Sequence, residues 1–183
     1  KALTVGADPF VMSPKEWRLY ENTVGNSGHS FKPTTPNLVD SAWVSRPNSP
    51  KNNIYPLSLK YTGKTSSSKL GDVRKIMNES GIGKDSKADV LLLTMLDEIA
   101  WLTNLRGSDI EYNPVFEAYA AIFQDRALCF CHHPEADLSK HCPDWEFRPY
   151  AEYPEFLEKI AQDENIKAWL DPSTITMGTR LAF

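Results

Sequence analysis

The sequence predicts an α/β protein, with a mixed β-sheet flanked by helices. Three features of residues 63–183 lead to this prediction: helix-spaced apolar residues after Gly63, a buried apolar run at 88–95, and a hairpin pattern at 115–132. Taken in order, these residues predict helix, strand, helix, hairpin, strand, helix and strand. That order is typical of a single α/β layer structure rather than a helical bundle or a β-sandwich.

A short strand and a capped helix open the chain. Leu3–Gly6 is apolar, and we interpret it as the last strand of an element that begins upstream. Ser13 is expected as an N-cap, with Pro14 at the first helical position and Glu16 completing a capping box. The helix has an apolar stripe of Trp17, Tyr20 and Val24. We expect that stripe to lack partners, so the first ~30 residues should be the least stable part of the chain.

Prolines dominate the next stretch and exclude long regular elements from it. We expect residues 32–62 to connect the end of one domain, residues 1–31, to a second domain at 63–183. An irregular surface loop within one domain is the alternative. One short helix is expected at Asn37–Trp43.

The second domain is predicted to begin with a helix capped by Ser67 or Ser68 and ended by Gly81 and Gly83. Its inward residues are expected to be Leu70, Val73, Ile76 and Met77. Ala88–Met95 should be a strand buried on both faces.

Leu96–Thr103 is predicted to be a short helix that turns Ile99, Trp101 and Leu102 inward. Trp101 is the expected core anchor, and removing its side chain should then cost about 3–5 kcal/mol. Val115–Phe123 and Ala127–His132 should pair as a hairpin. The remaining elements are expected to be a strand at Glu146–Tyr150, a helix from Pro154, a strand at Ile166–Leu170 and a helical turn capped by Ser173.

Composition limits the classes of function. A net charge of −4 argues against nucleic acid as a partner, and no apolar run approaches the ~20 residues of a membrane helix. No signal peptide is visible, and three cysteines without a secretory signal favour reduced thiols in a cytoplasmic protein.

Residues 97–119 are the most informative stretch. They include the run Asn104-Leu105-Arg106-Gly107-Ser108-Asp109 and closely resemble the middle domain of three-domain Xaa-Pro aminopeptidases, in the creatinase/prolidase group. The resemblance extends from the start of the chain to about residue 123, fades through 125–165, and returns at Trp169 and Asp171. Other matching segments are Val5–Phe10, Asn37–Asp40, Trp43, Arg46–Pro47, Tyr61–Gly63 and Lys69–Met77.

This resemblance implies a creatinase N-terminal-domain-like fold for residues 63–183, preceded by the end of a first such domain. It also implies a separate catalytic domain, in which two Asp, one His and two Glu hold two divalent metals, usually manganese. The implied partners are that catalytic domain and short proline-containing peptides. A homodimeric parent is compatible with the resemblance, and the sequence leaves the oligomeric state open. No catalytic or metal-binding residue of that set is expected within this chain.

Two polar segments were weighed for chemistry. Asp97 and Glu98 are adjacent, so on a helix they point about 100° apart, and Asp97 is expected to cap the helix that follows. The loop after it supplies the candidates for a substrate rim: Arg106, Asp109, Tyr112 and Asn113. The alternative for Arg106 is an internal salt bridge to Asp109 or to Asp97. Tyr119 is expected in the core.

The third segment is a tract of thiols and imidazoles: Cys129, Cys131, His132, His133, His141 and Cys142. Such side chains can bind zinc, and Cys129 and Cys131 would share one face of a strand. The spacing matches no familiar zinc motif, however, and the resembled family has no zinc site here. Buried or half-exposed thiols beside a surface loop are therefore expected.

Two functions follow from these observations. The chain is either a non-catalytic region of a metal-dependent Xaa-Pro aminopeptidase, which shapes substrate access, or a non-catalytic peptide- or protein-binding module of the same fold. No Ser/His/Asp set, P-loop or zinc-protease motif is present in the sequence.

Overall fold

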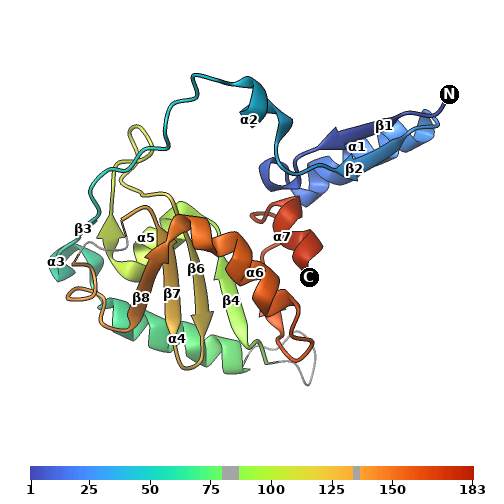
Figure 1. Ribbon diagram of the computed structural model, residues 1–183. Helices are drawn as coiled ribbons and strands as arrows, with labels where there is room; N and C mark the ends of the chain where they lie inside the picture. The colour runs from blue at the N-terminus through green and yellow to red at the C-terminus, as the bar shows by residue number, and fades with distance from the viewer. Residues whose placement is uncertain (80–86, 134–136) are drawn as a thin grey trace. The chain divides into compact units, whose positions relative to one another are not determined.

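The computed structural model describes residues 1–79, 87–133 and 137–183. The chain forms two compact units, shown in Figure 1. The terminal unit comprises Lys1–Ser49 and Asp171–Phe183, and the sheet unit comprises Pro50–Leu170. Residues 171–183 pack with the N-terminal segment. The expected domain limits at residues 31/32 and 62/63 stay a prediction. The assignment of residues 1–31 to the end of a preceding domain stays a prediction.

In the terminal unit, β1 (Thr4–Ala7) pairs in parallel with β2 (Ser30–Pro33), and α1 (Pro14–Asn26) connects them. The predicted capping box between Ser13 and Glu16 is confirmed. Trp17 is only 2% exposed, and its ring centroid lies 4.6 Å from that of Phe31. The expectation that Trp17 lacks a partner was therefore wrong, because β2 was not predicted.

The C-terminal segment completes the same unit. Helix α7 (Met177–Ala182) packs against the short helix η1 (Pro9–Val11). The Met177 amide donates a hydrogen bond to the Met12 carbonyl at 2.7 Å. Thr176, not Ser173, is the N-cap of α7. The Ser173 amide and hydroxyl both bind the Asp171 carboxylate instead. The short predicted helix in the connector is confirmed as α2 (Leu38–Ala42), capped by Asn37.

The sheet unit contains a five-stranded mixed sheet in the order β8-β7-β6-β4-β9, which confirms the predicted fold class. The β4–β6 and β6–β7 pairs are antiparallel, whereas β7–β8 and β4–β9 are parallel. Its strands are β4 (Val90–Leu93), β6 (Ala118–Phe123), β7 (Ala127–Cys131), β8 (Trp145–Pro149) and β9 (Ala168–Trp169). The predicted hairpin is the β6–β7 pair.

Helices cover both faces of this sheet (Figure 1). On one face, alternate side chains of β6 and β7 pack against α4 (Ser66–Glu79) and α5 (Leu96–Thr103), where Leu70, Ile99 and Leu102 are buried. On the other face, Phe130 contacts α6 (Tyr153–Ala161) through Phe156, with ring centroids 5.0 Å apart. Val90 and Leu92 of β4 are buried and Leu91 and Leu93 are half-buried, so burial on both faces is partial.

Smaller elements lie at one end of the sheet unit. Strand β3 (Tyr55–Pro56) pairs with β5 (Leu105–Arg106), and neither strand was predicted. Helix α3 (Leu59–Thr62) follows β3 in the chain. The short helix η2 (Tyr150–Glu152) follows β8 and contacts β7 and α6. Within the described ranges, no helix combines the length and apolarity needed to cross a membrane.

Two further predicted caps, at α4 and α5, were also wrong. Helix α4 begins at Ser66, and Thr65 accepts the Lys69 amide through its carbonyl and the Ser68 amide through its hydroxyl. Ser67 and Ser68 therefore lie inside the helix. The predicted stops at Gly81 and Gly83 lie outside the described residues.

At α5 the residue before the helix is Met95, so Asp97 is not the N-cap. It lies in the first turn, where its carboxylate accepts the Glu98 amide at 3.0 Å. A negative charge there is still favourable to the helix dipole.

The bounds predicted for α5 are confirmed, but the prediction that Trp101 faces the core was wrong. Ile99 and Leu102 face the core, whereas Trp101 is 53% exposed. On a helix, residues three apart share a face, so Ile99 and Leu102 point together and Trp101 does not. Its ring instead lies 4.3 Å from the Lys69 ammonium.

This geometry predicts different effects for two neighbouring substitutions, and it lowers the cost expected for removing the Trp101 side chain. Trp101→Ala should lower the free energy of unfolding by about 1 kcal/mol or less, mainly through the lost cation–π contact. Leu102→Ala empties a buried site and should cost about 2–5 kcal/mol. Urea unfolding of both variants measures the difference, and a loss of about 3 kcal/mol or more for Trp101→Ala would contradict the placement.

Candidate functional site

The C-terminus of α5 is bonded by side chains from three other segments. A helix leaves its last four carbonyls without intrahelical partners. Here each one accepts a side-chain hydrogen bond. The pairs are Ala100 with Arg106 Nη1 (2.6 Å), Trp101 with Lys69 Nζ (2.6 Å), Leu102 with Ser66 Oγ (2.8 Å) and Thr103 with Cys142 Sγ (3.0 Å). We call this set of contacts the α5 cap.

Two of the four donors are cations placed at the negative end of the helix dipole, where positive charge is stabilising. Of these two cations, Lys69 is the more deeply buried, because only 2% of the residue is exposed. Its ammonium also donates to Asn104 Oδ1 at 2.6 Å. Burial, and secondarily the positive charge of Arg106, lower the pKa of Lys69. The ammonium is thus paired only with neutral oxygens and an indole ring.

Asn104 turns the chain at the end of the helix. Its backbone is left-handed, with φ of 59°, a conformation that Asn adopts more readily than most residues. Its side-chain amide donates to the Lys64 carbonyl at 2.8 Å, and its own carbonyl accepts the Leu57 amide at 2.8 Å. One residue therefore fastens the 57–64 segment to α5.

The loop that follows is held by internal contacts. Arg106 donates to the carbonyls of Ala100 and Leu105, and in the described ranges it forms no ion pair with Asp109 or Asp97. Both salt bridges weighed for Arg106 were therefore wrong. Asp109 accepts the backbone amides of Asn52 and Glu117, each at 2.9 Å. It ties the residues before β3 to the residues before β6.

The other two rim candidates face solvent. Tyr112 is 95% exposed and also has a positive φ of 62°. Asn113 is exposed, and its amide donates to the Ile110 carbonyl at 3.1 Å. The structure thus places all four candidates on one loop, with Arg106 and Asp109 supporting it and Tyr112 and Asn113 presented at its surface. Their contact with substrate stays a prediction.

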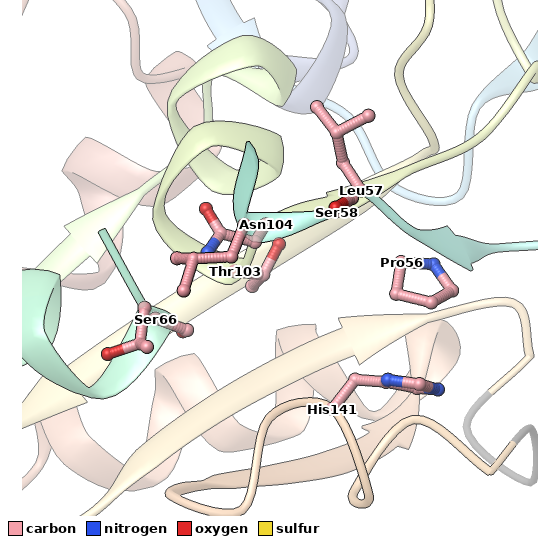
Figure 2. Close-up of a pocket in the computed structure, with 9 residues that line it drawn as sticks. Pro56, Leu57, Ser58, Ser66, Thr103, Asn104 and His141 are labelled. Atoms are coloured by element: carbon pink, nitrogen blue, oxygen red, sulfur yellow. The ribbon is translucent and has the colours of Figure 1, made fainter. Parts of the chain in front are cut away.

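A pocket of about 420 Å³ adjoins the α5 cap (Figure 2). Ser66, Thr103 and Asn104 belong both to the cap region and to the pocket wall. The complete lining is Pro56, Leu57, Ser58, Leu59, Thr65, Ser66, Thr103, Asn104 and His141. Sequence reasoning missed both Ser66 and Lys69. The signal that could have found them is their helical spacing relative to Leu70 and Val73, which puts all four residues on one face of α4.

The thiols of the Cys/His tract are buried. Cys129 and Cys131 share a face of β7, as predicted, and Cys142 is buried as well. A hydrogen bond with Cys131, together with burial, raises the pKa of Cys129, and burial raises the pKa of Cys142 to about 12. A cysteine that stays a protonated thiol at neutral pH is a poor nucleophile and a poor metal ligand.

The imidazoles point elsewhere. His132 follows β7 on the opposite face, where its ring lies 2.9 Å from the Glu117 carboxylate and stacks on Tyr150. His133 Nε2 lies 2.7 Å from the Lys51 carbonyl. Across the ranges that the structure describes, no three or more His, Cys, Asp or Glu side chains gather as metal ligands would. Tyr119, expected in the core, is half-buried and stacks on Tyr153 at 3.9 Å.

Comparison with known proteins identifies the class. The chain belongs to the creatinase/prolidase N-terminal domain family, whose match covers residues 45–183. It is 37% identical over 166 residues to a probable Xaa-Pro aminopeptidase P of Sordaria macrospora, covering 86% of this chain and 26% of that protein. It is 32% identical to the Xaa-Pro aminopeptidase ApepP of Drosophila melanogaster, covering 95% of this chain and 28% of that protein.

A solved structure gives the same result. The X-prolyl aminopeptidase of Caenorhabditis elegans, described as a cytosolic enzyme with a di-nuclear active site, matches with a TM-score of 0.82 at 25% identity. The match covers 98% of this chain and 29% of that one. The chain therefore spans between a quarter and a third of the length of these relatives.

Two glycine substitutions, one in the loop after α5 and one inside α4, should have opposite effects on the stability of the sheet unit. A Cβ on Gly107 would lie 2.7 Å from Phe116 Cβ and 3.2 Å from the Val115 carbonyl, so Gly107→Ala should destabilise the sheet unit by about 1–3 kcal/mol. A Cβ on Gly71, inside α4, would meet nothing within 4 Å, and Gly71→Ala should stabilise by about 0.5–1 kcal/mol. Chemical unfolding of both variants provides the test. An unchanged or raised stability for Gly107→Ala would show that the loop is not packed as described.

Proposed function

We propose that this chain is a non-catalytic region of a metal-dependent Xaa-Pro aminopeptidase, an enzyme that removes an N-terminal residue preceding proline. The observation that carries the proposal is the match to the C. elegans enzyme, which includes nearly the whole of this chain but less than a third of that one. The names of the two curated relatives support the same assignment. In this proposal the parent is cytosolic, as that neighbour is described to be.

The parent's catalytic metals belong outside this chain. The C. elegans relative is described as having a di-nuclear active site, and we propose two divalent ions, with manganese as the expected metal, for the parent. Among the described residues, the carboxylates, imidazoles and thiols do not form a set that fits such a centre. The chain's proposed partners are consequently its own catalytic domain and short proline-containing peptides.

The proposed role of this region is to shape substrate access. The loop from Asn104 to Pro114 is anchored at one end by the α5 cap and at Asp109 by two amide hydrogen bonds. A loop fixed in this way can hold exposed side chains in one place at low conformational cost. Tyr112 and Asn113 are the residues it presents. We retain residues 1–31, 32–62 and 63–183 as the proposed end of a first domain, connector and second domain.

The test uses the full-length parent, cloned from the transcript that encodes this chain. It should cleave the first residue from an Arg-Pro-Pro peptide in the presence of manganese and lose activity on chelation, whereas the 183-residue chain should not cleave it. In the parent, Tyr112→Ala should raise KM without lowering the melting temperature, and exposed Tyr61 is the matched control. A folded parent that binds the peptide without cleaving it would instead establish the non-catalytic binding module.

A further inference from the structure

The connector between α2 and β3 carries an exposed serine that is followed by proline. Ser49 is the last residue of the terminal unit, and Pro50 is the first residue of the sheet unit. Residues 46–53 are all exposed, and none of them belongs to a helix or a strand (Figure 1). An enzyme that modifies side chains can therefore reach the Ser49 hydroxyl without opening a packed element.

Two prolines keep this segment extended. Proline fixes its own φ at about −65° and has no amide hydrogen, and it disfavours the helical conformation in the residue before it. Arg46 precedes Pro47 and Ser49 precedes Pro50, so a helical turn is disfavoured at both positions. Among the described residues, none of residues 47–50 forms a hydrogen bond. The Ser49 hydroxyl is thus carried on an extended backbone that is not paired with another segment.

Two other positions in the sequence have a hydroxyl residue followed by proline, namely Ser13 and Thr35. Ser13 is not presented in the same way. Its hydroxyl donates to the Glu16 carboxylate at 2.7 Å and accepts the Glu16 amide at 3.2 Å, and Pro14 is buried. The contacts that begin helix α1 therefore occupy both residues of this pair.

Thr35 and Ser49 share one local pattern. In residues 33–36 and in residues 47–50, one proline lies two residues before the hydroxyl residue and another lies directly after it. This is the pattern preferred by proline-directed protein kinases, whose cleft binds an extended peptide and accepts, after the acceptor, a residue with no amide hydrogen. The sequence alone does not separate the two positions.

The structure does separate them. Pro33 is the last residue of β2, and the Thr34 amide donates to the Ala7 carbonyl at 2.9 Å. Asn37, which directly follows Pro36, caps α2 by accepting the Val39 amide at 2.9 Å. A kinase that binds the Thr35 segment in extended form would have to release the end of β2 and the cap of α2. The Ser49 segment requires neither change.

We propose that Ser49 is a phosphorylation site for a proline-directed protein kinase. In the transfer, Ser49 Oγ forms a bond to the γ-phosphorus of magnesium-bound ATP, and the bond from that phosphorus to the oxygen bridging to the β-phosphate breaks. ADP leaves with the electron pair, and the hydroxyl proton passes to the catalytic aspartate of the kinase. This proposal does not depend on the assignment of the chain to an aminopeptidase.

The charges around Ser49 suit its product. Arg46 lies three residues before Ser49 and Lys51 lies two residues after it, and residues 46–51 contain no acidic side chain. A phosphate carries a charge of about −1.5 to −2 at pH 7, so it is placed among cations here. Some kinases instead recognise an arginine three residues before the acceptor. The proline-directed class is favoured, because the Arg46 guanidinium is paired with the Asp40 carboxylate.

The experiment incubates the 183-residue chain with an active mitogen-activated protein kinase and magnesium-ATP, and maps phosphate by mass spectrometry. One phosphate per chain is expected, at Ser49. The rate at Thr35 should be at least about tenfold lower, because its segment must first open. Two synthetic peptides, residues 29–41 and 43–55, should be phosphorylated at similar rates. That result would show that the fold, and not the local sequence, protects Thr35.

Three variants of the whole chain identify what the kinase recognises. Ser49→Ala should remove the phosphate, and the exposed, unbonded position makes this change harmless to folding. Pro50→Ala should lower the rate about tenfold or more, whereas Arg46→Ala should leave it within about twofold.

Four results would overturn the proposal. They are equal rates at Thr35 and Ser49 in the folded chain, phosphorylation of the 43–55 peptide but not of the folded chain, no phosphorylation of either, or a rate that depends on Arg46 and not on Pro50. The peptidase assay on the parent is a separate measurement. A parent that cleaves Arg-Pro-Pro while Ser49 stays unmodified would reject the phosphorylation site alone.

Discussion

The packing of the sheet unit depends on the hydrogen bonds that the last four carbonyls of α5 accept from side chains. This end of the helix is packed against the core, so its four free carbonyls need partners other than water. Lys69 and Ser66 come from α4, Arg106 comes from β5, and Cys142 comes from the segment before β8. The same contacts that end the helix therefore hold α4, the β5 loop and the edge of the sheet to it. Asn104 extends this arrangement to residues 57–64.

This arrangement gives a structural meaning to the stretch that most resembles the family. Asn104 supplies the left-handed turn, Arg106 returns to cap the helix, Gly107 allows the close approach of Phe116, and Asp109 joins two flanking segments. These residues position the loop that carries Tyr112 and Asn113, and Asn104 also lines the pocket. In this protein, the position of this loop and the stability of the core depend on the same contacts.

Local patterns predicted the local structure well. The capping box at Ser13, the bounds of α5 and the β6–β7 hairpin each follow from residues within a few positions of one another. Strands β2, β3 and β5 were missed because they are short and their pairing partners are distant in the sequence. Strands β2 and β3 also lie near prolines. The caps proposed at Ser67 or Ser68 and at Ser173 failed because a neighbouring Thr was equally suitable, and packing decided between them.

The site was harder to predict than the fold. Three of the α5 cap contacts join residues more than 30 positions apart, so no local spacing reveals them. Lys69 was not among the residues predicted to face inward, because a lysine is almost never fully buried without partners, and its acceptors lie far away in the sequence. Trp101 was predicted to lie on the inward face of the helix, next to the most apolar strand, whereas its exposed ring lies against the Lys69 ammonium.

Replacement of Lys69 tests most directly whether the α5 cap stabilises the sheet unit. Lys69→Met keeps the length and apolar stem of the side chain but removes the charge, so urea unfolding compares a capping ammonium with a buried alkyl group. If the cap stabilises the unit, the loss of the bonds to Trp101 and Asn104 should cost about 1–3 kcal/mol. Lys75→Met on the exposed side of the same helix should change the stability by about 0.5 kcal/mol or less. A Lys69→Met variant as stable as the original chain, or more stable, would mean that the cost of burying the ammonium exceeds the value of its bonds, and it would contradict the account.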